Sequence, residues 1–96
     1  MSSKPFQIVL YGRPGCHLCD QVEQLILLLR EEFPLELRLV NIEKDPALHE
    51  RYMFVIPVVE IDGEEVFPSV THVVTWEELH AELAKRAARK TGRKSR

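Results

Sequence analysis

The order of apolar patterns around one turn constrains the fold of this chain more than any other sequence feature. Phe6–Tyr11 is a short apolar run rich in strand-forming residues, and it ends at a Gly-Arg-Pro-Gly turn signal at residues 12–15. From Cys16 to about Glu32 apolar residues recur at helical spacing, which predicts a helix. Leu35–Asn41 then alternates apolar and polar residues, which predicts a half-buried strand. This strand–helix–strand order predicts a right-handed parallel pair of strands.

The next segments predict a short helix and a hairpin. Asp45 is placed to cap a helix over about Pro46–Tyr52, because Asp at the N-cap and proline at the first helical position are both favoured. Ile56–Ile61 and Glu64–Phe67 are strand patterns. The Asp-Gly pair at residues 62–63 favours a two-residue turn between them.

A capping box predicts the start of the last helix. Thr75 is placed as the N-cap and Glu78 as the third helical residue, so that each satisfies a backbone N–H of the other. The expected buried face of this helix consists of Trp76, Leu79, Leu83 and Ala87. The complete order, β-α-β-α-β-β-α, predicts an α/β fold with a four-stranded mixed sheet and helices on both faces.

Length and charge describe a small domain with an uneven distribution of charge. The 96 residues suit one domain over residues 1–96. Residues 1–84 contain six basic and all 15 acidic residues, a formal charge of −9, whereas the last twelve residues carry +7. We expect a flexible basic tail at about 90–96. We interpret this tail as a solvated helix end, because basic residues are favoured near the C-terminus of a helix, rather than as a contact for nucleic acid or an acidic partner. No nucleic-acid partner is therefore expected.

Targeting signals are not evident in the sequence. The longest apolar runs fall far short of the roughly 20 residues that cross a bilayer, so no membrane association is expected. The first residues show no signal-peptide pattern, and we therefore expect a cytoplasmic location.

The two cysteines, Cys16 and Cys19, carry the most specific chemistry in the sequence. A disulfide across two intervening residues closes a very small loop and stabilises little, which favours a redox role over a structural one. Cys16 lies at the first turn of a predicted helix, where free backbone N–H groups and the helix dipole lower a thiol pKa. Cys16 is therefore the expected attacking thiol and Cys19, one turn on, the resolving thiol.

Two nearby side chains can influence the Cys16 sulfur. Arg13 adds positive charge three residues earlier. His17 is a candidate for tuning the pKa of Cys16, since a cation or donor there would stabilise the thiolate; the alternative is a solvent-facing histidine of little influence.

Other uses of the cysteine pair remain open at this stage. A structural zinc site would need about four ligands, and no histidine pair here has ligand spacing. An iron–sulfur cluster shared between two copies, or a metal carrier, would use the same sulfurs. Inert core cysteines are disfavoured by the surface turn that precedes Cys16. A further alternative is an adaptor whose basic tail binds an acidic partner. We expect no metal.

Several motifs together resemble the glutaredoxin-like branch of the thioredoxin superfamily. They are Tyr11–Cys19 (Tyr-Gly-Arg-Pro-Gly-Cys-His-Leu-Cys), Arg51-Tyr52, Ile56-Pro57-Val58 and Asp62-Gly63. The likeness spans about residues 5–84 and is closest to small bacterial proteins with a Cys-His-Leu-Cys site. It implies a thioredoxin-like fold with sheet order 2-1-3-4.

The resemblance also implies site residues. Cys16 would be the exposed nucleophile and Cys19 the resolving thiol. Ile56–Pro57 would be a cis peptide bond that turns the Ile56 backbone toward an extended substrate, and Arg13 matches a basic position that contacts glutathione. Two features depart from the usual glutaredoxin pattern: the residues between the cysteines, and residues 67–72, which lack the usual glycine pair.

The sequence therefore predicts a monomeric thiol–disulfide oxidoreductase that acts on protein or low-molecular-weight disulfides. No cofactor is expected to be bound. Electrons would come from glutathione, as a co-substrate, or from a reductase protein.

Overall fold

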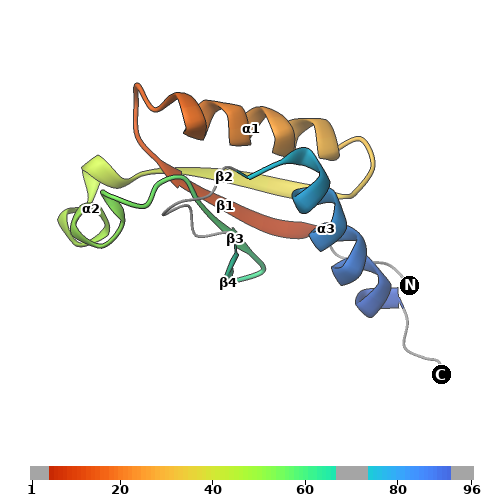
Figure 1. Ribbon diagram of the computed structural model, residues 1–96. Helices are drawn as coiled ribbons and strands as arrows, with labels where there is room; N and C mark the ends of the chain where they lie inside the picture. The colour runs from red at the N-terminus through yellow and green to blue at the C-terminus, as the bar shows by residue number, and fades with distance from the viewer. Residues whose placement is uncertain (1–4, 67–73, 92–96) are drawn as a thin grey trace.

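The described part of the chain comprises residues 5–66 and 74–91 of a computed structural model (Figure 1). Its elements are β1 (Phe6–Gly12), α1 (His17–Leu29), β2 (Leu35–Asn41), the 3-10 turn η1 (Ile42–Lys44), α2 (Pro46–Tyr52), β3 (Val58–Ile61), β4 (Glu64–Val66) and α3 (Trp76–Thr91). The predicted order of helices and strands is confirmed. Most of the basic tail predicted at about 90–96 lies outside the described residues, as does Phe67.

The four strands form one sheet in the order β2-β1-β3-β4. β1 is parallel to β2, and their last paired residues are Gly12 and Asn41. β3 is antiparallel to β1, with Val59 opposite Leu10, and β4 is antiparallel to β3. The mixed sheet and its order 2-1-3-4 are therefore confirmed. The first crossover also brings the start of α1 to the edge where β1 ends.

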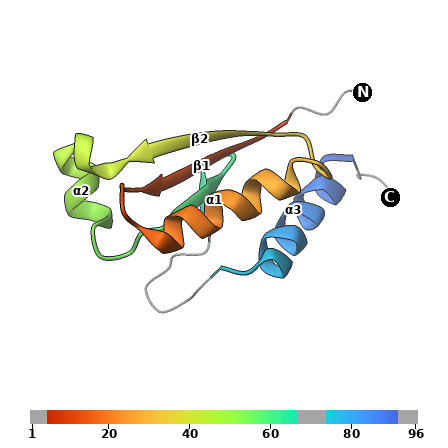
Figure 2. The same cartoon turned by 90° about the horizontal axis from the view of Figure 1, so that it is seen from above.

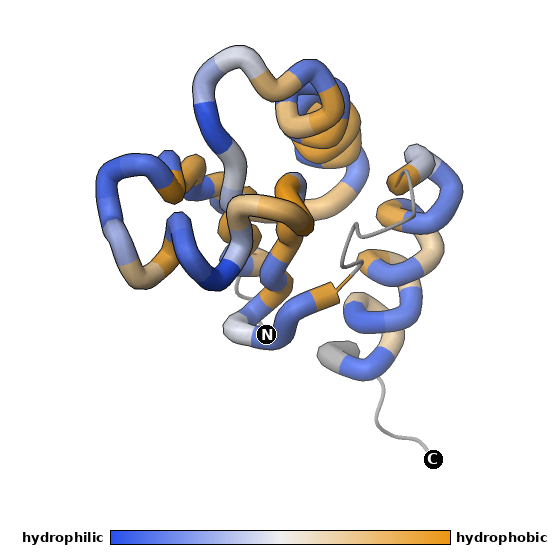
Figure 3. Tube along the Cα trace, turned by 60° about the vertical axis from the view of Figure 1, so that its left-hand side comes forward, coloured by the Kyte–Doolittle hydropathy of each residue, from blue (hydrophilic) through white to orange (hydrophobic). Residues whose placement is uncertain are grey.

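α1 and α3 cover one face of the sheet, as Figure 2 shows from above. The core beneath them consists of apolar side chains that are at most 7% exposed: Phe6, Ile8, Leu10, Val22, Ile26, Leu29, Leu35, Val59, Ile61, Val74, Leu79 and Leu83. Polar and apolar residues alternate along α3 in Figure 3, as expected for a helix with one buried face. Each such buried side chain contributes roughly 1.5–3 kcal/mol, so this core fixes α1 on the sheet.

The opposite face carries a smaller apolar cluster beside α2. Ile42, Tyr52 and Val58 form this cluster, and Tyr11 packs against it. Tyr11 and Val58 are opposite each other in the sheet, one residue on from Leu10 and Val59, so period-two alternation turns them to the α2 side. The predicted placement of helices on both faces is confirmed.

Local hydrogen bonds explain where these elements begin. The Asp45 side chain accepts hydrogen bonds from the N–H groups of Ala47 and Leu48, which caps α2 as predicted. Asp62 and Gly63 both have positive φ, 52° and 86°, as a two-residue hairpin turn requires. The capping box of α3 is also present: Glu78 N–H donates to Thr75 Oγ1 at 3.2 Å, and Thr75 N–H donates to Glu78 Oε1 at 3.0 Å.

Two predicted boundaries are wrong by a few residues. α1 ends at Leu29 rather than at about Glu32, and the chain leaves it through tight turns in which Glu32 N–H bonds to the Leu29 carbonyl. Pro34 restricts only Phe33, the residue before it, so the proline limits this helix without fixing its last residue. β3 begins at Val58 rather than Ile56. Val58 is the first β3 residue paired with β1, opposite Tyr11, and Pro57 before it has no N–H to donate to the sheet.

One predicted core residue is also wrong. Trp76 is 37% exposed. It lies in the first turn of α3, and its ring stacks on that of His80, with centroids 4.7 Å apart, instead of entering the core that Leu79 and Leu83 fill.

Candidate active site

The turn after β1 places Cys16 at the start of α1. Gly15 has a φ of 81°, which favours glycine, and Cys16 N–H bonds to the Arg13 carbonyl at 3.4 Å. Cys16 itself is the N-cap, with extended backbone angles, so the helix proper begins at His17. The predicted helix start at Cys16 is thus shifted by one residue, which places the sulfur over the free N–H groups of the first turn.

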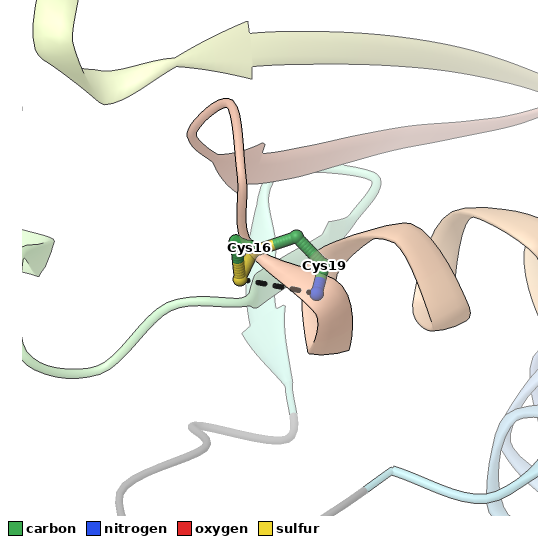
Figure 4. Close-up of a disulfide and its surroundings, with 2 residues drawn as sticks. All are labelled: Cys16 and Cys19. Carbon is green, nitrogen blue, oxygen red and sulfur yellow. Dashed lines mark hydrogen bonds between the residues drawn. A yellow bond between two sulfur atoms is a disulfide. The ribbon is translucent and has the colours of Figure 1, made fainter.

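The two cysteines are joined in a disulfide at this helix start (Figure 4). Their Cα atoms are 5.2 Å apart, and Cys19 N–H donates a hydrogen bond to Cys16 Sγ at 3.2 Å. Cys16 is half-buried, whereas Cys19 is only 6% exposed. The arrangement therefore offers one sulfur to a partner and holds the other behind it.

The electrostatic surroundings favour a negative charge on Cys16. The N-terminus of a helix carries a partial positive charge, and the amide of Cys19 already points at the sulfur. Arg13 and His17 are both exposed and lie on either side of Cys16 in the chain. Asp20 in the first turn, also exposed, adds an opposing charge. Backbone amides, which are fixed and close, thus form the main support for a thiolate.

The second predicted segment of the site precedes β3. The Ile56–Pro57 peptide bond is cis, as the resemblance implied. Pro57 is buried and Ile56 is half-buried. The segment passes the N-terminal end of α1 in Figures 2 and 4.

A pocket of about 200 Å³ lies on the β2 side of the disulfide. Its lining includes Gly12, Arg13, Cys19, Glu23 and Asn41, but neither residue of the Ile56–Pro57 pair. The residues predicted to bind substrate therefore fall into two groups, with Arg13 beside this pocket and Ile56 and Pro57 outside it.

A pair of tyrosines beneath the site was not recognised as a unit from the sequence. The rings of Tyr11 and Tyr52 have centroids 4.8 Å apart, and their hydroxyls donate to Glu60 at 2.9 Å and Glu65 at 2.7 Å. Burial, reinforced by Glu65, raises the pKa of Tyr52 to about 12. Burial and the bond to Glu60 also raise the pKa of Tyr11. Because Tyr11 directly precedes Gly12, these contacts hold α2 against the strand end that leads into the site.

Among residues 5–66 and 74–91, no three His, Cys, Asp or Glu side chains are grouped so that they could hold a metal ion. The helices of the same residues include none that is long and apolar enough to cross a membrane.

The fold and the site together define a glutaredoxin-like protein with the thioredoxin fold and a cysteine pair at the start of its first helix. The chain belongs to the family described as Glutaredoxin-like domain (DUF836), whose model matches residues 7–84. This match covers both cysteines and the Ile56–Pro57 bond.

Several solved structures are similar to this chain. Protein Ne2328 from Nitrosomonas europaea is 25% identical, with a TM-score of 0.70 over 85% of this chain and 95% of its own. Structural genomics target protein XcR50 from X. campestris is 30% identical, with a TM-score of 0.64 over 81% of this chain and 96% of its own. Thioredoxin 1 from Thermosipho africanus is 14% identical and shares the fold, with a TM-score of 0.68 over 90% of this chain and 99% of its own.

Proposed function

We propose that this protein is a thiol–disulfide oxidoreductase in which Cys16 attacks and Cys19 resolves. The observation that carries the proposal is the asymmetry of the pair. Cys16 is accessible, and its Sγ accepts a hydrogen bond from Cys19 N–H at 3.2 Å, while the Cys19 side chain is only 6% exposed. Family membership supports a redox role for this pair.

The proposed cycle has two exchange steps. The Cys16 thiolate attacks a substrate disulfide, which forms a mixed disulfide and releases one substrate thiolate. Cys19 then attacks Cys16 Sγ, which closes the Cys16–Cys19 bond and releases the second substrate thiolate. Two electrons pass from the dithiol to the substrate, and an external thiol donor restores the dithiol.

The substrates proposed are protein or low-molecular-weight disulfides, bound by a monomer in the cytoplasm. The backbone of Ile56, next to Pro57, would pair with an extended substrate in the manner of a strand. Arg13 would contact a substrate carboxylate. Glutathione or a reductase protein is the proposed electron donor, with no bound cofactor.

Trapping the intermediate tests the proposal. Reduced Cys19→Ser should accumulate a mixed disulfide at Cys16 when mixed with a model protein disulfide, whereas Cys16→Ser should form none; mass spectrometry distinguishes the two. Equal adduct formation by both variants, or stoichiometric metal in protein purified from cells, would refute it. Parallel assays with glutathione plus its reductase and with a thioredoxin-reductase system would then identify the donor.

A further inference from the structure

Gly12, the last residue of β1, lies directly against the buried cysteine. A Cβ atom placed on Gly12 would lie 2.9 Å from Cys19 Sγ and 3.1 Å from Cys19 Cβ. Both distances are shorter than carbon atoms normally approach such neighbours. Gly12 is itself buried, so an added methyl group would have to displace Cys19 or the strand end.

The other described glycines are used differently. Gly15 and Gly63 have positive φ values of 81° and 86°, and a Cβ on either would meet nothing within 4 Å. Those two glycines serve the backbone conformation of turns. Gly12 has no such φ, and what its missing side chain provides is space beside a sulfur atom.

We propose that Gly12 is a positioning residue for the resolving sulfur: its missing side chain lets Cys19 Sγ lie against the end of β1 while bonded to Cys16. The inference deepens the proposed function, because it concerns the step in which Cys19 displaces the substrate. In that step the Cys19 thiolate forms a bond to Cys16 Sγ, the bond from Cys16 to the substrate sulfur breaks, and the substrate leaves as a thiolate with that electron pair.

The contact acts differently on the two redox states. In the disulfide, the bond to Cys16 fixes Cys19 Sγ, so a methyl group at residue 12 meets an atom that cannot move away. In the dithiol, the Cys19 thiol is free to rotate about its Cα–Cβ bond. A side chain at residue 12 therefore penalises the disulfide more than the dithiol, in addition to a smaller cost from the Cys19 Cβ contact that both states share.

The redox equilibrium of Gly12→Ala tests this directly. The full-length variant is equilibrated with a dithiothreitol buffer, and the disulfide fraction is counted by alkylation and mass spectrometry. We expect a shift of about tenfold or more toward the dithiol, on the scale of an overpacked contact. The matched control is Val9→Ala, in the same strand but facing the other side of the sheet, which should leave the equilibrium within about twofold.

A second background separates positioning from a general loss of stability. Thermal unfolding is compared for Gly12→Ala alone and in a Cys19→Ala chain, where the sulfur is absent. At least half of the loss in Tm should disappear in that chain. An unchanged redox equilibrium, or an equal loss of Tm in both backgrounds, overturns the proposal. The buffer measurement needs no enzymatic activity, so a wild-type protein that fails to reduce substrates would refute the proposed function while leaving the Gly12 result to stand or fall alone.

Discussion

At the start of α1, Cys16 Sγ accepts a hydrogen bond from Cys19 N–H at 3.2 Å; at the start of α3, Thr75 Oγ1 accepts one from Glu78 N–H, also at 3.2 Å. Both helices therefore use the side chain of their N-cap residue to satisfy the amide three positions on. The two helices differ in the residue three positions after the N-cap. The Glu78 carboxylate accepts a hydrogen bond from Thr75 N–H, whereas Cys19 forms a disulfide with Cys16, the N-cap residue of its helix.

The difference shows how one local geometry serves stability in one place and chemistry in another. A hydroxyl at a helix start stays protonated and only satisfies amides. A thiol in the same position has a pKa within reach of neutral pH, so the same amides and dipole stabilise its ionised form. The tight packing of Cys19 against Gly12 then supplies the second sulfur at the required place.

Making the two caps chemically alike should have the largest effect. In Cys16→Ser the α1 cap becomes a hydroxyl like that of Thr75, so disulfide reduction should fall by about 10³-fold or more, as for loss of a nucleophile. The stability of the reduced protein should change by less than about 1 kcal/mol, since serine is a good N-cap. Activity assays and urea unfolding under reducing conditions measure the two. Retention of a tenth of the activity would show that Cys16 is not the nucleophile.

The tyrosines test a third region, on the face of the sheet that carries α2. Tyr52 has a pKa raised from 10.0 to about 12 in the folded protein, so the unfolded chain ionises first and the stability that Tyr52 contributes is lost as pH rises from 10 to 12. Between pH 10 and 12, the free energy of unfolding of Tyr52→Phe should fall by roughly 1–2 kcal/mol less than that of the wild type. This is less than the whole pKa shift would give, because Glu65 is exposed and solvent weakens its interaction with Tyr52. Urea unfolding across that pH range measures it. A variant as sensitive to alkali as the wild type would contradict the assignment.

Removing the α3 cap should affect stability alone. Thr75→Ala leaves the Glu78 amide without its partner and should cost about 1 kcal/mol. Thermal or urea unfolding measures this cost. The rate at which Cys16 is alkylated should stay within about twofold, because Cys16 Sγ accepts its hydrogen bond from Cys19 N–H of its own helix. A parallel loss of Cys16 reactivity would show that the caps are coupled.

His17 should have the smallest effect. Its side chain is exposed, so solvent screens any charge it carries. His17→Ala should slow alkylation of Cys16 by about threefold or less at neutral pH, as followed with a thiol reagent. A much larger decrease would show that His17, rather than the backbone amides, is the main group that stabilises the thiolate.

Much of the fold could be predicted because its signals are local. The Asp45 and Thr75 caps, the Asp62-Gly63 turn and the strand patterns each specify their own segment. The early end of α1 was missed because Pro34 limits the helix without fixing its last residue. The exposure of Trp76 was missed because Leu79 and Leu83, rather than Trp76, fill the core in space. The sheet order and the cis Ile56–Pro57 bond followed only from the family resemblance, since neither has a local physical signature here.

For the site, the sequence placed the cysteine pair at a helix start but did not predict the packing around it. The Pro-Gly turn before Cys16 and the helical spacing of the apolar residues after it were enough to place both cysteines at a helix start. Gly12 contacts Cys19 across layers, and the ring of Tyr11 contacts that of Tyr52 from a distant segment, so no sequence periodicity encodes either contact. Such contacts become visible only in three dimensions.

The most direct test of this account is the pH dependence of alkylation at each cysteine of the reduced protein, resolved by mass spectrometry. We predict that Cys16 reacts with an apparent pKa below the value of about 8.5 found for free cysteine, and that Cys19 reacts more slowly at every pH. An apparent pKa at or above 8.5 for Cys16, or faster reaction at Cys19, would contradict the claim that the start of α1 holds an ionised, accessible sulfur.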